Sequence, residues 1–107
     1  MRILFGLATL AALGATAASA EPNRLSDVDY LQAARCVGLA SSKTLASPDQ
    51  KALVAWFRVE TRGRPGFIVD KADEMQRDAQ SQANHADVYA RPRLEAELNG
   101  ACASLRS

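Results

Sequence analysis

The residues best suited to acid–base or metal chemistry are the single histidine, His85, and a run of acids within residues 70–78. Three of these acids are spaced by four residues, which places them on one face of a helix: Asp70, Glu74 and Asp78. Carboxylates on one face can attract a cation, but the run lacks the glycine of a calcium-binding loop and includes two basic residues. The pattern favours a solvated helix face, and we expect no metal site here.

A catalytic role for His85 would require a group that orients it or a nucleophile that it activates. Asp87 is close in sequence, but residues two apart on a helix point to different sides, and no serine lies in a nucleophile motif. A haem would need His85 and Met75 on opposite sides of its ring, which one helix cannot provide, and the chain has no C-x-x-C-H motif. We therefore predict no enzyme activity, no catalytic residue and no cofactor, and a surface position for His85 near a helix break.

Three arginines gather where one predicted helix ends: Arg58, Arg62 and Arg64. Guanidinium groups bind phosphates and carboxylates through paired hydrogen bonds, so the three form a candidate binding patch. The alternative is a structural role, because basic side chains near a helix C-terminus interact favourably with its carbonyl dipole. The sequence leaves both interpretations open.

The two cysteines, Cys36 and Cys102, allow one intramolecular pairing. Small residues surround both, with Gly38 two positions after the first and Gly100 two positions before the second. Helix axes usually lie about 8–10 Å apart, whereas a disulfide needs Cα atoms about 4.4–6.8 Å apart, and small neighbours permit that approach. We predict a disulfide that stabilises the fold by about 4 kcal/mol, because it closes a long loop.

A disulfide indicates an oxidising compartment, and the N-terminus predicts export. Arg2 precedes an apolar run over residues 3–13, and the small residues Ala18-Ser19-Ala20 follow. This order is typical of a secretory signal peptide, so we predict a signal over residues 1–20, cleavage after Ala20, and a periplasmic or secreted product. An uncleaved membrane anchor is the alternative, although the second half of the segment is weakly apolar for a membrane span.

Removal of the signal leaves residues 21–107, a single domain with 12 basic and 12 acidic residues. A chain without net charge has no electrostatic preference for nucleic acid or anionic lipid. We therefore expect no nucleic-acid partner and no stable membrane insertion of the processed chain. A domain this short has a thin core, so a covalent link helps to stabilise it.

Two helices are expected before the arginine group. Ser26 followed by acids predicts a helix over residues 27–41. Its expected inner face consists of small and aliphatic residues with an aromatic residue beside them: Val28, Leu31, Ala34, Val37 and Gly38, flanked by Tyr30. Ser47 and Pro48 predict the start of a second helix over residues 48–61. Because this helix carries the only tryptophan, Trp56, we expect it at the centre of the core.

The second helix is predicted to end at Gly63, in the left-handed conformation, and a third to begin between Pro65 and Asp70. Apolar residues then recur at helical spacing to Leu105, but Pro92 predicts a break, with Pro92 at the start of a fourth helix. The pattern leaves open whether residues 66–106 form one kinked helix or two. The predicted fold class is all-α: a small bundle of three or four helices stapled by one disulfide and preceded by a cleavable signal-peptide helix.

These features favour a small exported protein with a non-catalytic binding or interaction role, and an envelope protein as its partner. Its size, signal and two cysteines resemble the outline of small helical envelope proteins such as acid-stress chaperones and inhibitor or immunity proteins, but no motif identifies a family. An acid-stress chaperone is one alternative, because the acids neutralise at low pH and the basic residues then repel one another. A small envelope enzyme is a weaker alternative, since its only support is one histidine and scattered carboxylates.

Overall fold

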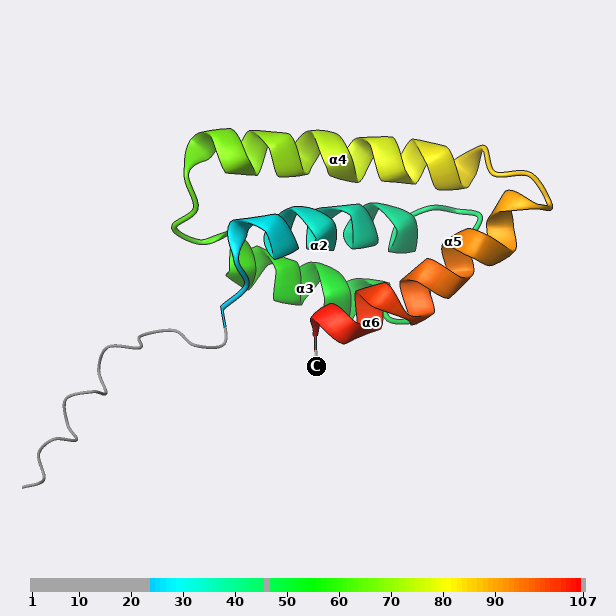
Figure 1. The fold of residues 1–107 in the computed structure, drawn as a ribbon, viewed down its shortest axis with the longest axis horizontal. Helices are drawn as coiled ribbons and strands as arrows, with labels where there is room; N and C mark the ends of the chain where they lie inside the picture. Colours follow the sequence, from blue (N-terminus) through cyan, green and yellow to red (C-terminus); the bar gives the residue numbers. More distant parts are fainter. Residues whose placement is uncertain (1–23, 46, 107) are drawn as a thin grey trace, which may run out of the picture.

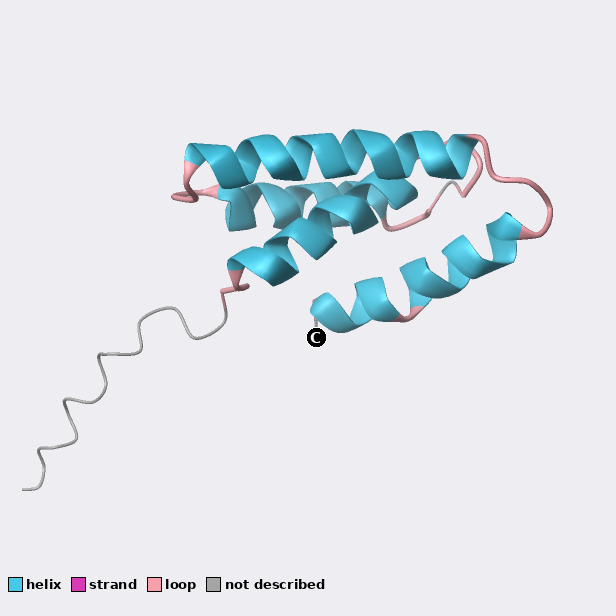
Figure 2. Cartoon of the chain, turned by 45° about the horizontal axis from the view of Figure 1, so that its top comes forward, coloured by secondary structure: helices cyan, strands magenta, loops and turns pink. Residues whose placement is uncertain are grey.

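The computed structural model describes residues 24–45 and 47–106. These residues form five helices: α2 (Asp27–Ala40), α3 (Gln50–Thr61), α4 (Gly66–Asn84), α5 (Ala90–Asn99) and α6 (Ala101–Leu105). The two described ranges contain no strand, so the prediction of an all-α fold is confirmed (Figure 2). The predicted signal peptide, residues 1–20, lies outside them.

Helix α2 is the central element of the fold, with α4 on one side and α3 on another, and α5 and α6 along its C-terminal half (Figure 1). The predicted N-cap is confirmed, because Ser26 Oγ accepts a hydrogen bond from the Asp29 backbone N–H at 3.1 Å. Every residue from Cys36 to Ala40 is buried. The second half of α2 is thus enclosed by its neighbours, which explains its small and apolar composition.

The expectation that the second helix forms the centre of the core is wrong. Within the described residues of α3, Leu53 alone is fully buried, and Trp56 and Phe57 are half-buried. The helix also begins at Gln50 rather than at Pro48. Ser47 Oγ accepts from the Asp49 backbone N–H at 3.3 Å, so it stabilises a turn that precedes the helix.

The inner face of α2 also differs from the prediction at its first turn. Val28 is 70% exposed, whereas Tyr30 is 1% exposed. The Tyr30 ring stacks on the Phe57 ring with centroids 4.8 Å apart, and its hydroxyl forms a hydrogen bond with Thr61 Oγ1 at 2.9 Å. Because the hydroxyl has a partner, the whole tyrosine can be buried, and it links α2 to α3.

Helices α2 and α4 pack so closely that the backbone of α4 occupies the space that a side chain at Gly38 would need. A Cβ placed on Gly38 would lie 2.2 Å from the Gln76 carbonyl oxygen and 2.9 Å from the Ala79 Cβ. Ala72, Ala79 and Ala83 of α4 are buried against α2. The expectation that Gly38 permits the approach of the cysteine helices is wrong, because Gly38 lies in the contact between α2 and α4.

The stretch after Pro65 contains two breaks. Helix α4 begins at Gly66, within the predicted range, and the left-handed conformation of Gly63 is confirmed by its φ of 77°. The predicted break occurs over residues 85–89, before Pro92, which is the third residue of α5. Proline is tolerated there because N–H groups in the first turn have no intrahelical acceptor. A second break at Gly100 separates α5 from α6.

The predicted disulfide is present and joins α2 to α6. Cys36 and Cys102 are both buried, and their Cα atoms lie 5.7 Å apart. They belong to a cluster with Val37, Ala40 and Leu53, against which Trp56, Leu98 and Leu105 pack.

Among the described helices, none has the length and apolar character needed to span a membrane.

Substitution of Gly38 tests the close contact between α2 and α4. We expect Gly38→Ala to lower the free energy of unfolding by about 2 kcal/mol or more, because the added methyl group meets backbone rather than a flexible side chain. Urea unfolding of the oxidised, processed chain measures this change. Gly66→Ala is the matched control, since a Cβ at Gly66 meets no atom within 4 Å, and a change within about 0.5 kcal/mol is expected. Equal effects of the two substitutions would contradict the contact.

Removal of the disulfide measures how much the bond contributes to the free energy of unfolding. We expect the double variant Cys36→Ser with Cys102→Ser to lose about 4 kcal/mol, because the bond closes a loop across a sequence separation of 66 residues. The same unfolding experiment measures the loss. Reductant should lower the stability of the parent chain by a similar amount and leave the double variant unchanged. A loss of less than about 1 kcal/mol would show that the bond adds little to the packed helices.

Candidate functional site

The three arginines of the predicted patch have different environments. The side chain of Arg64 is 4% exposed, and its guanidinium lies over the Tyr30 ring, with 4.4 Å from Cζ to the ring centroid. Its nitrogens donate to Asp27 Oδ1 at 2.7 Å, to Glu60 Oε1 at 3.0 Å and to the Leu25 carbonyl at 2.8 Å. Arg64 therefore holds the N-terminal end of α2 to the end of α3.

Arg58 and Arg62 are exposed. Among the described residues, Arg58 has no hydrogen-bond or ion-pair partner and lies on the wall of a groove, whereas Arg62 is the residue that follows α3. The binding patch stays a prediction. Within it, Arg58 is the residue that the fold places beside an apolar hollow.

The groove lies over α2 between α3 and α4 and has a volume of about 340 Å³. Its apolar lining comes from all three helices: Tyr30, Val37, Val54, Phe57, Val69 and Ala72. Its polar lining is Arg58, Thr61, Asp73 and Gln76. Thr61 and Asp73 have partners in the chain, Tyr30 and Arg77, so Arg58 is the charge available to a ligand. The arrangement suits apolar groups that carry a carboxylate at one edge.

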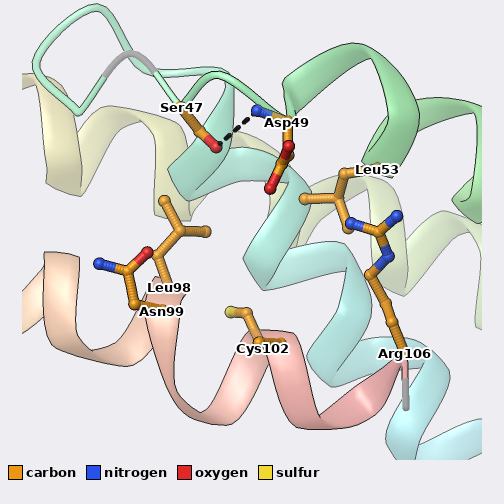
Figure 3. Close-up of a pocket in the computed structure, with 8 residues that line it drawn as sticks. Ser47, Asp49, Leu53, Leu98, Asn99, Cys102 and Arg106 are labelled. Atoms are coloured by element: carbon orange, nitrogen blue, oxygen red, sulfur yellow. Dashed lines mark hydrogen bonds between the residues drawn. The ribbon is translucent and has the colours of Figure 1, made fainter.

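A second hollow lies between the start of α3 and the α5–α6 segment and has a volume of about 290 Å³ (Figure 3). Leu53, Leu98 and the disulfide-bonded Cys102 supply its apolar surface. The remaining lining residues are mainly polar: Ser47, Asp49, Asn99, Ala103 and Arg106. We call this hollow the disulfide pocket. It offers a ligand an apolar surface together with two opposite charges.

No pattern in the sequence singles out the charged residues of the disulfide pocket, Asp49 and Arg106. They come from distant parts of the chain, and the disulfide brings them together by holding α6 close to α2. The one signal available in the sequence was the predicted disulfide itself. It placed Cys102 near Cys36, but it did not place the start of α3.

His85 is exposed at the C-terminal end of α4, which confirms its predicted surface position near a helix break. Its Nδ1 lies 2.8 Å from the Ser81 carbonyl oxygen. The acidic run is exposed along α4, with ion pairs from Arg77 to Asp73 at 2.8 Å and from Lys71 to Glu74 at 3.1 Å. The described residues contain no group of three or more His, Cys, Asp or Glu side chains that could hold a metal ion.

A further ion pair joins α2 to α5 beside the core. Arg35 donates to both carboxylate oxygens of Glu97, at 2.6 and 2.9 Å, and to Gln82 of α4 at 2.9 Å. The hydrogen bond to Glu97 raises the pKa of Arg35 above its ordinary value, although burial acts in the opposite direction. A raised pKa in the folded state stabilises the fold at every pH below the ordinary arginine range, and the contribution is lost only as the pH rises above it.

The fold and its two hollows define a small, disulfide-stapled helical protein with concave sites large enough for side chains or small ligands. No protein-family model, curated protein or solved structure matches the chain. Because a fold by itself does not imply a function, the function must come from the residues that line these sites.

Substitution of Arg64 and of Arg58 tests whether the first arginine stabilises the fold and the second does not. We expect Arg64→Ala to lower the free energy of unfolding by about 2–4 kcal/mol, because it removes the buried cation that Asp27, Glu60 and the Tyr30 ring share. Arg58→Ala should change stability by less than about 0.5 kcal/mol, since its side chain is exposed. Thermal and urea unfolding measure both variants. Similar losses for the two variants would contradict the distinction between them.

Proposed function

We propose that this chain is an exported, non-catalytic binding protein of the bacterial envelope. The unpartnered guanidinium of Arg58 beside the apolar groove carries this proposal. A cation at the edge of an apolar groove complements an amphipathic segment of another protein, with apolar side chains in the groove and a carboxylate on Arg58. The partner is an envelope protein, because the chain is proposed to act in the periplasm.

Two features support this compartment. Residues 1–20 have the charge and hydropathy pattern of a signal peptide with a cleavage site after Ala20. The disulfide between Cys36 and Cys102 is compatible with an oxidising compartment. The equal numbers of acids and bases after residue 20 favour a protein partner over nucleic acid or anionic lipid.

The scaffold is also suited to binding. The disulfide and the ion pairs of Arg64 and Arg35 hold α2 to the other elements, so the groove is largely pre-formed. A pre-formed groove loses less conformational entropy when a partner docks. The polar groups around Arg64 are used for this structural purpose, which leaves Arg58 for recognition.

Site-specific photo-crosslinking in cells tests the groove. A photoreactive residue replaces Asp73, on the wall opposite Arg58, in the full-length chain. We expect one discrete protein adduct in the periplasmic fraction, and at least a fivefold lower adduct yield when Arg58→Glu is added, because the charge then repels the partner's carboxylate. Arg58→Lys should keep most of the adduct.

The control places the same photoreactive residue at Glu95, an exposed position of α5 that does not line the groove. Little or no adduct is expected from that position. Equal labelling from both positions, or an adduct yield from position 73 that Arg58→Glu does not change, would contradict the groove as the binding site.

A further inference from the structure

The disulfide pocket shares no lining residue with the groove, and its chemistry indicates a different kind of ligand. Its floor is apolar, because Leu53 and Leu98 belong to or pack against the cluster that contains both cysteines. The disulfide between Cys102 and Cys36 fixes this floor covalently. At about 290 Å³ it is just below the range of about 300–1,000 Å³ that ligand pockets occupy. The volume suits one small molecule rather than a protein segment.

Asp49 contributes a carboxylate that the fold does not use. It is the N-cap residue of α3, where an aspartate usually accepts a hydrogen bond from a backbone N–H of the first turn. The Asp49 side chain makes no such bond and has no other partner among the described residues. Figure 3 shows its carboxylate directed toward the space above Cys102.

Arg106 contributes the opposite charge. Its guanidinium lies over the Trp56 ring, with 5.9 Å from Cζ to the ring centroid, and no described carboxylate forms an ion pair with it. The side chain extends from α6 alongside Leu53 toward the rim that bears Asp49 (Figure 3). This cation–π contact leaves the N–H groups of the guanidinium able to bind a carboxylate.

An anion and a cation therefore line one apolar-floored hollow without an ion pair between them. We propose that the disulfide pocket binds a small zwitterion with an apolar side group, namely an apolar α-amino acid. The ammonium group of the ligand contacts Asp49, its carboxylate contacts Arg106, and its side chain covers Leu53, Leu98 and the disulfide. A ligand with one charge would leave one of the two protein charges unmatched.

Three probes of similar shape test this assignment: L-leucine, 3-methylbutylamine, which lacks the carboxylate, and 4-methylpentanoate, which lacks the ammonium group. Each is titrated into the oxidised, processed chain labelled with ¹⁵N, and amide shifts give the Kd. We expect L-leucine to bind in the millimolar range, with shifts centred on Leu53, Leu98 and Cys102. The two singly charged probes should bind at least about tenfold more weakly, because each loses one charge-assisted contact.

Variants assign each contact. Asp49→Asn should weaken L-leucine about tenfold and leave 4-methylpentanoate unchanged, whereas Arg106→Gln should weaken L-leucine and leave 3-methylbutylamine unchanged. Glu74→Gln and Lys71→Gln, on the exposed pair of α4, are the matched controls and should change nothing. Each of three results would overturn the proposal. The first is the absence of amide shifts with L-leucine at 100-fold the expected Kd range, and the second is an equal affinity for the three probes. The third is a loss of L-leucine affinity in the control variants equal to the loss in Asp49→Asn and Arg106→Gln.

Discussion

The close approach of α2 and α4 is the constraint on which the rest of the structure depends. Gly38 faces the Gln76 carbonyl oxygen at a distance that no side chain could occupy, and a row of buried alanines continues the contact. Small residues bury little apolar area each, so this interface relies on many short contacts rather than on large side chains. It also places α2 at the centre, where α3, α5 and α6 can pack on its remaining surface.

A thin core of this kind needs additional links between helices, and among the described residues one covalent link and two ionic links meet at α2. The disulfide joins α2 to α6, Arg64 holds the start of α2 to the end of α3, and Arg35 joins α2 to α5 through Glu97. All three involve α2. The two hollows follow from this arrangement, because helices that each pack on a common central helix leave concave surfaces between them. Three charged residues that have no ion-pair partner among the described residues line those surfaces: Arg58, Asp49 and Arg106.

The sequence by itself determined the local features. Ser26 caps α2, and Gly63 adopts the left-handed conformation after α3. The helical structure is interrupted before Pro92, and the two cysteines form a disulfide. Capping, backbone freedom at glycine and the missing N–H of proline act within a few residues, so they can be predicted without knowledge of the fold. The pairing followed from the count, because two cysteines have one possible partner each.

Only the tertiary structure decided which helix lies at the centre, why Tyr30 is buried and Val28 exposed, and which arginine is available to a ligand. Periodicity reports which face of a helix is apolar, but not which neighbour covers it or how closely that neighbour approaches. Gly38 and Arg64 show the difference. Each has a role set by atoms far away in the chain, the Gln76 carbonyl oxygen for one and Asp27 with Tyr30 for the other. The placement of Asp49 and Arg106 around one pocket has the same origin, since packing and the disulfide bring these distant residues to the same site.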